Sequence, residues 1–166
     1  MIKTLAIAVT SISLLAFVAA FAPAKDPVEA ARLNNIGVAY MNQQLFEKGL
    51  KAFEEAAAKD PNLKVTTLNR GVGLLNLQRI DESKALLEKA SKEDPSDPHA
   101  FYSLGLYYKN SSDPEAAVVA FRRVTEIDPN DADTWYFLGS TYAQLKQFPA
   151  AISAFEHALK LEPLHA

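Results

Sequence analysis

The sequence predicts an all-α protein, an α-solenoid of four 34-residue helix-turn-helix repeats that follow an N-terminal apolar leader helix. The first observation is a proline that returns every 34 residues, at Pro61, Pro95, Pro129 and Pro163. The second is a glycine with the same spacing, at Gly37, Gly71, Gly105 and Gly139. Two residue types that share one period and one phase indicate stacked structural repeats. The third observation is the leader itself, residues 1–24.

The leader has the composition of a secretory signal peptide. Lys3 supplies a positive start, residues 5–22 are almost entirely apolar, and the small residues Ala22 and Ala24 suit a cleavage site after residue 24. An apolar run of this length is also near the short end of a membrane span, so an uncleaved anchor is the alternative. In both cases we expect the repeats to be exported: periplasmic, secreted, or anchored outside the cytoplasm.

The rest of the chain consists of four copies of one 34-residue sequence repeat. Residues 25–29 form a short linker and the start of the first helix, and the repeats are 30–63, 64–97, 98–131 and 132–165. Each repeat is numbered here from 1 to 34. Position 8 holds the recurring glycines, and position 24 holds Phe53, Leu87, Phe121 and Phe155. A small residue opposite a large one lets two helices approach closely, so each repeat is expected to be a helical hairpin.

Proline and aspartate mark where the helices begin and end. Asp26-Pro27 starts the first helix, and an Asp-Pro or Glu-Pro pair near position 32 ends the second helix of each repeat. In repeat three, Asp113 and Pro114 start the second helix, where Ser112 and Glu115 could add a capping box. The polar residue at position 13 is expected to close the first helix: Asn42, Asn76, Asn110 and Gln144. Eight helices result.

The repeats resemble the tetratricopeptide repeat family. The motif is clearest in repeat four, at Trp135, Leu138, Gly139, Tyr142, Ala151, Phe155, Ala158 and Pro163. The resemblance implies an α-solenoid that winds as a right-handed superhelix and binds protein or peptide partners. Repeat two departs most from the motif, since Thr67, Ser83 and Leu87 stand where bulky, small and aromatic residues are usual. Looser packing is expected there.

Composition and motifs argue against an enzyme, a cofactor site or nucleic-acid binding. The net charge is -3, so no basic surplus exists to neutralise phosphates, and the absence of cysteine removes thiolate chemistry. Gly71-Val72-Gly73 lacks the strand that a phosphate loop needs, so it indicates close helix packing. The three histidines are scattered, and Ser153 with His157 has no identifiable orienting acid, so neither a metal site nor a hydrolase is predicted.

The resemblance places the binding surface on the first helix of each repeat, which lines the concave groove. The predicted groove residues are Asn34, Asn35, Asn69, Tyr102, Ser103, Tyr136 and Phe137. Asparagine can pair with a peptide backbone irrespective of its sequence, and tyrosine can anchor a bound chain. The alternative is that these residues are simply solvated. Chaperone-binding members grip a C-terminal carboxylate with a Lys, Asn and Arg clamp, of which only Asn69 is matched here.

The predicted function is therefore an exported, non-catalytic scaffold that binds a protein or peptide and helps to assemble a complex. The alternative is the repeat region of a larger enzyme or transport protein, where it recruits the substrate. The last helix also predicts an unfinished packing surface, at Ile152, Phe155, Ala158, Leu159 and Leu161. We expect that surface to be covered by a continuing chain, by a partner, or by a second copy through self-association of the C-terminal repeat.

Overall fold

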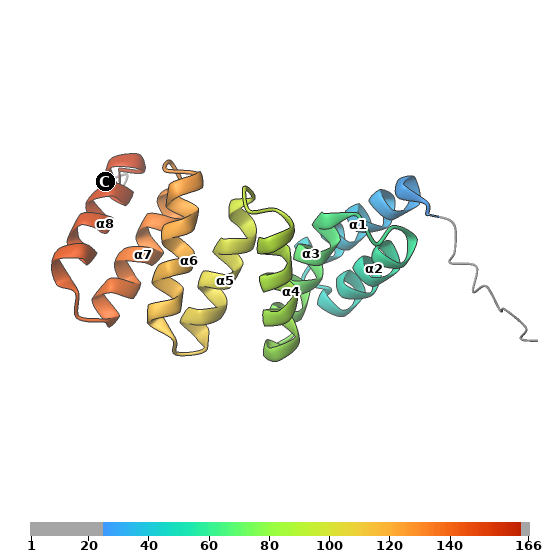
Figure 1. Cartoon of the computed structure of the whole chain (residues 1–166), viewed down its shortest axis with the longest axis horizontal. Helices are drawn as coiled ribbons and strands as arrows, with labels where there is room; N and C mark the ends of the chain where they lie inside the picture. The colour runs from blue at the N-terminus through green and yellow to red at the C-terminus, as the bar shows by residue number, and fades with distance from the viewer. Residues whose placement is uncertain (1–24, 164–166) are drawn as a thin grey trace, which may run out of the picture.

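The computed structural model describes residues 25–163, which form eight helices and no strand (Figure 1). The helices are α1 (Pro27–Asn42), α2 (Phe46–Lys59), α3 (Lys64–Asn76), α4 (Ile80–Glu93), α5 (Pro98–Asn110), α6 (Pro114–Ile127), α7 (Ala132–Gln144) and α8 (Phe148–Leu161). The predicted all-α solenoid is confirmed. The predicted signal peptide or anchor at 1–24 lies outside the described residues. Within them, no helix has the length and apolar character needed to cross a membrane.

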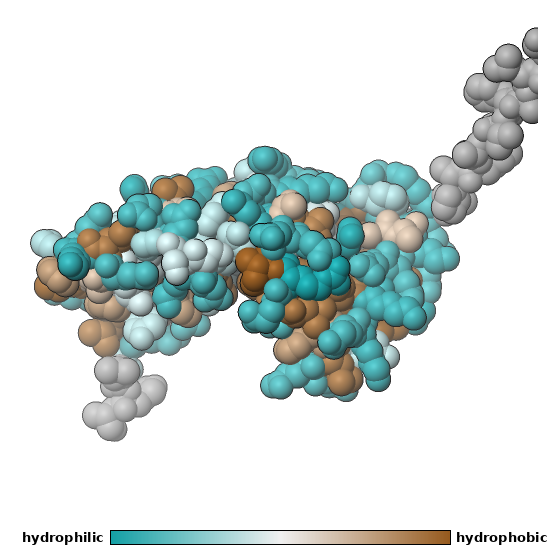
Figure 2. Space-filling model, turned by 90° about the horizontal axis from the view of Figure 1, so that it is seen from below, coloured by the Kyte–Doolittle hydropathy of each residue, from teal (hydrophilic) through white to brown (hydrophobic). Residues whose placement is uncertain are grey.

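Helices pack mainly on their neighbours along the chain, so the molecule is elongated, with α1 and α8 at opposite ends (Figure 1). Each first helix packs against the second helix of its own repeat, and the second helices α2, α4 and α6 pack against the first helix of the next repeat. The surface is mainly hydrophilic, with hydrophobic residues visible at the end formed by the last repeat, at the left of Figure 2, and over the middle of the molecule. A chain of local contacts is the arrangement that a solenoid requires.

The predicted helix starts and stops are found, with one correction. Asp26 accepts a hydrogen bond from the Glu29 backbone N–H at 2.9 Å, and Asp113 accepts one from Ala116 at 3.1 Å. The predicted Ser112–Glu115 capping box is wrong, because Ser112 has a left-handed backbone (φ 57°) and the aspartate alone caps α6. Each second helix ends one residue before an Asp-Pro or Glu-Pro pair.

The turn between the helices of each repeat uses a residue that the sequence analysis did not select. Position 13 is the last residue of each first helix, as expected, but it is not the left-handed one. The left-handed residues lie two positions later, at Gln44, Gln78, Ser112 and Lys146, with φ between 57° and 60°. No glycine occupies the site, so four non-glycine residues share the mild strain of this conformation.

The core forms where the position 8 glycine meets the position 24 side chain. A Cβ atom added to Gly71 would lie 2.8 Å from Leu87, and one added to Gly105 would overlap the ring of Phe121. Gly71 therefore serves close helix packing, as predicted. Leu87 and Phe121 are fully buried. This contact joins the two helices of a repeat and fixes which face of the first helix remains for other contacts.

Candidate peptide-binding surface

The seven predicted groove residues lie on the first helices α1, α3, α5 and α7, but the structure exposes them very differently. Asn35 and Tyr136 are exposed, and 56% of the Tyr136 surface is accessible. Three are partly buried: Asn69, Tyr102 and Phe137. Asn34 and Ser103 are buried. The predicted set therefore contains both accessible groups and groups that hold neighbouring repeats together.

The two polar buried residues use their side chains inside the protein. Asn69 on α3 donates a hydrogen bond from Nδ2 to Oδ1 of Asn34 on α1, at 2.8 Å. Ser103 donates its hydroxyl to the His99 carbonyl oxygen one turn earlier, also at 2.8 Å. Position 5 of one repeat thus meets position 6 of the next. Of the three predicted groove asparagines, only Asn35 is exposed.

The same two positions form an aromatic contact between repeats three and four. Tyr102 on α5 meets Phe137 on α7 with ring centres 5.9 Å apart, and Phe137 stacks on Phe121 at 5.7 Å. Tyr136 contacts the edge of Phe137 at 5.8 Å. Offset and edge-on aromatic pairs are favourable beyond the area that they bury. The first-helix surface is therefore held rigidly at this junction, with Tyr136 projecting from it.

A cavity of about 200 Å³ opens beside Tyr102, between α5, α6 and α7. Its lining combines apolar and aromatic side chains with acidic ones: Pro98, His99, Tyr102, Val124, Asp128, Asp131 and Asp133. Partial burial raises the pKa of the Tyr102 phenol, and the negative charges of Asp133 and Asp131 raise it further. The arrangement offers carboxylate oxygens to a donor and presents no lysine or arginine, so it suits a positively charged or hydrogen-bond-donating side chain.

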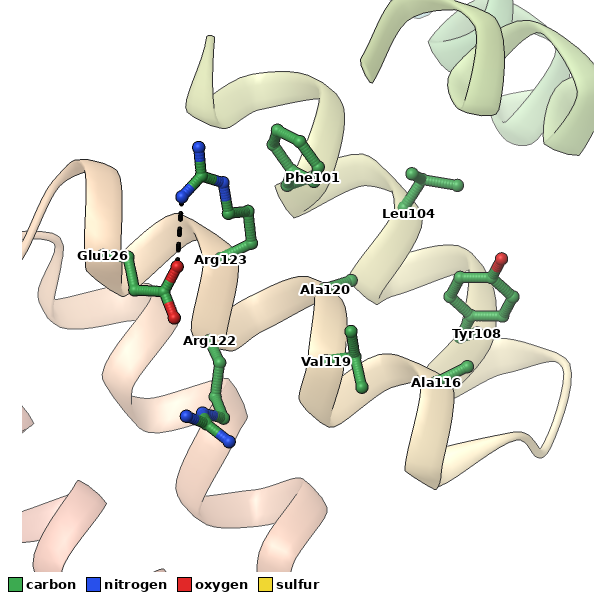
Figure 3. Close-up of a pocket in the computed structure, with 9 residues that line it drawn as sticks. All are labelled: Phe101, Leu104, Tyr108, Ala116, Val119, Ala120, Arg122, Arg123 and Glu126. Carbon is green, nitrogen blue, oxygen red and sulfur yellow. Dashed lines mark hydrogen bonds and ion pairs between the residues drawn. The ribbon is translucent and has the colours of Figure 1, made fainter. Parts of the chain in front are cut away.

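A second and larger groove, of about 650 Å³, was not predicted from the sequence (Figure 3). It lies between α5 and α6 and has an apolar floor at Phe101, Leu104, Tyr108, Ala116, Val119 and Ala120. Arg123 at its edge pairs with Glu126 at 3.1 Å, lies over the Phe101 ring and donates to the Pro95 carbonyl oxygen. None of these residues was among the predicted groove residues. The signal available in the sequence was Val119, an aliphatic residue on the outward side of α6, which is 71% exposed.

The serine and histidine of α8 do not form a catalytic pair. His157 Nδ1 lies 2.9 Å from the backbone carbonyl oxygen of Ser153, and its ring stacks on Trp135 at 4.5 Å. Between residues 25 and 163, no group of three or more His, Asp or Glu side chains is placed to hold a metal ion. The surfaces described above are suited to holding another chain.

These features define an α-solenoid built from helical hairpins. The family model described as the N-terminal TPR repeats region of Psidin matches residues 31–165, and the chain belongs to this family of tetratricopeptide repeats. No curated protein matches the sequence.

Solved structures with the same fold share little sequence with this chain. The crystal structure of MamA has a TM-score of 0.75 at 20% identity, and the match covers 82% of this chain and 80% of the MamA chain. YrrB, a TPR protein with an unusual peptide-binding site, has a TM-score of 0.70 at 24% identity, and the match covers 82% of this chain and 70% of the YrrB chain. The first TPR of Spaghetti (RPAP3), bound to the HSP90 peptide SRMEEVD, has a TM-score of 0.69 at 20% identity. The match covers 74% of this chain and 97% of the RPAP3 chain. At this level of identity the likeness concerns the fold.

Proposed function

We propose that this protein is an exported, non-catalytic scaffold that binds a protein or peptide on its first-helix surface and helps to assemble a complex. The observation that carries the proposal is the acidic cavity beside Tyr102, which lies on the surface where the predicted groove residues are found. Asn35 and Tyr136 extend the surface with exposed hydrogen-bonding groups. Two structural neighbours support a peptide as the class of ligand: YrrB is described as having a peptide-binding site, and RPAP3 is bound to an HSP90 peptide.

The charge of the cavity indicates which peptide would bind. Asp128, Asp131 and Asp133 face a space that also contains the Tyr102 ring, so a lysine or arginine side chain would find both carboxylates and an aromatic face. The peptide bound to the RPAP3 repeat, SRMEEVD, ends in acidic residues. A chain with that ending would meet repulsion here, so the ligand class differs from that neighbour's.

A capture experiment with the full chain tests the surface. The Asn35→Ala/Tyr102→Phe/Asp128→Asn triple variant removes polar groups from the surface and keeps the Tyr102 ring that packs on Phe121. Val28→Ser, at the exposed start of α1, is the control. We expect a partner from the envelope or secreted fraction to bind the wild-type chain and the control, and to bind the triple variant about tenfold or more weakly. Equal binding by the triple variant would place the interaction elsewhere.

Export is tested separately at the N-terminus. If residues 1–24 are a cleaved signal, mass spectrometry of the purified exported protein should find Lys25 as the first residue. If they are an anchor, the intact chain should fractionate with the membrane while added protease digests the repeats from outside the cytoplasm. A soluble protein that keeps Met1 in the cytoplasm would contradict both forms of the proposal.

A further inference from the structure

Within residues 25–163, no following helix covers the apolar surface of the last repeat at the α8 end of the molecule. A depression of about 340 Å³ lies between α7 and α8, with Tyr136, Phe155, Ala158 and Leu159 as its apolar part and Asp133 and Glu162 at its rim. We call these six residues the end face. Leu159 is 48% exposed and Tyr136 is 56% exposed. The acidic residues leave the rim negatively charged.

The junction between repeats three and four shows what such a face holds when it is covered. There Tyr102 and Phe121 occupy repeat positions 5 and 24, and Phe137 of the following helix rests against both rings, at 5.9 and 5.7 Å. Tyr136 and Phe155 occupy the same two positions in repeat four and contact each other at 5.7 Å. The end face is therefore a second copy of a helix-binding site whose natural occupant presents one aromatic side chain.

The other end of the molecule is unsuited to fill this site. The position 3 residue of each following first helix is small and buried: Thr66, Ala100 and Thr134. In α1 this position is Arg32, exposed and paired with Glu29 at 2.7 Å, and position 6 is Asn35 rather than an aromatic residue. Stacking α1 of a second copy on the end face would bury this ion pair. The free energy lost by removing the two charges from water would exceed the free energy gained from the new contact. The charged and polar residues of α1 therefore make it a poor partner for the end face, and head-to-tail stacking of two copies is disfavoured.

Two end faces are also poorly matched to each other. Asp133 and Glu162 rim the depression, and Glu156 occupies the repeat position of Arg122, which in repeat three borders the contact with α7 and α8. A symmetric dimer would bring these carboxylates together, and no lysine or arginine lines the depression to balance them. Like charges at close range oppose association, whereas a basic partner gains from the same rim.

We propose that the end face binds an amphipathic α-helix of a partner protein, with an aromatic residue packed against both Tyr136 and Phe155 and lysine or arginine residues beside the acidic rim. The end face shares Asp133 with the Tyr102 cavity, and its Tyr136 also belongs to the proposed peptide-binding surface. It depends on Leu159 and Glu162 of the second helix, which the proposed peptide-binding surface does not use, so either proposal can fail without the other.

The test measures binding of synthetic helical probes to the full chain by fluorescence anisotropy. The basic probe is a stapled helix of 14 residues, the length of α8, with a central Phe flanked by Lys on both sides. Stapling removes the ordering cost of so short a helix. One control probe replaces Lys by Glu, and another replaces the Phe by Ala. We expect each control probe to bind at least about tenfold more weakly than the basic probe.

Variants of the chain then locate the site. Leu159→Asp should weaken the basic probe about tenfold or more, while Val28→Asp, at the exposed start of α1, should leave it unchanged. Glu162→Lys should weaken the basic probe and strengthen the acidic one, and it changes only an exposed side chain. Equal binding of basic and acidic probes, or an unaffected Leu159→Asp, would overturn the proposal. A dimer in light scattering that Leu159→Asp dissociates would assign the face to a second copy and overturn it too.

Discussion

Replacing Phe121 with alanine should lower the free energy of unfolding by about 3–5 kcal/mol, the usual cost of truncating a fully buried phenylalanine. The ring is fully buried on α6 and lies against the Gly105 backbone. It stacks on Phe137 at 5.7 Å and meets Tyr102 edge-on at 6.1 Å. Each aromatic pair adds about 0.5–1.5 kcal/mol beyond the buried area, so the upper half of the range is expected.

Phe155 provides the matched comparison, because it holds the same repeat position in repeat four. It also packs on a position 8 glycine, Gly139, but it is only partly buried and has one aromatic neighbour, Tyr136, at 5.7 Å. The following helix that would cover it is absent from the described fold. Phe155→Ala should therefore cost only about 1–2 kcal/mol, in proportion to the smaller area removed from water.

Urea unfolding of the full chain, followed by circular dichroism, measures both costs. Hydrogen exchange over α6 and α8 should accompany it, because a solenoid can lose its terminal repeat before the rest unfolds. Phe121→Ala should increase exchange in α5, α6 and α7 together, whereas Phe155→Ala should affect α8 and α7. If the two substitutions cost the same within about 0.5 kcal/mol, the reasoning from repeat position and exposure would be refuted.

Three further outcomes can be measured on the same protein. Leu87→Ala should cost about 2–4 kcal/mol in urea unfolding, less than Phe121→Ala, because the leucine is buried but makes no aromatic pair; a larger cost would contradict the looser packing expected of repeat two. Asn34→Ala should cost about 1–3 kcal/mol by thermal or urea unfolding, because it leaves the Asn69 amide without its 2.8 Å partner; no change would show that the pair is dispensable. The raised pKa of Tyr102 means that the folded state keeps its phenol proton to higher pH than the unfolded state. Its contribution to stability is therefore fully present below the unfolded pKa and lost as pH rises above about 10. Tyr102→Phe should reduce this alkaline loss of stability, and an unchanged pH profile would count against the shift.

The sequence by itself determined the helices and their phase. Aspartate caps the start of α1, α5, α6 and α7 through hydrogen bonds to residues two or three positions later, and an Asp-Pro or Glu-Pro pair follows the end of each second helix. The position 8 glycine and the position 24 side chain form a contact within one hairpin. Such features depend on spacing, so four aligned repeats suffice to predict them. The same locality makes the tetratricopeptide repeat family recognisable from the sequence.

Only the tertiary structure decided which side chains remain available between repeats. Asn34 and Asn35 are adjacent in sequence, yet one is buried against Asn69 and the other is exposed, since the rotation between successive hairpins selects the face that is covered. The left-handed turn residue at position 15 likewise follows from how the two helices must meet. Tyr136 and Phe155 occupy the same repeat positions as Tyr102 and Phe121, but in the described fold no helix follows to cover them. The local sequence pattern is the same in both repeats, so only the tertiary structure shows that one pair is covered and the other forms the end face.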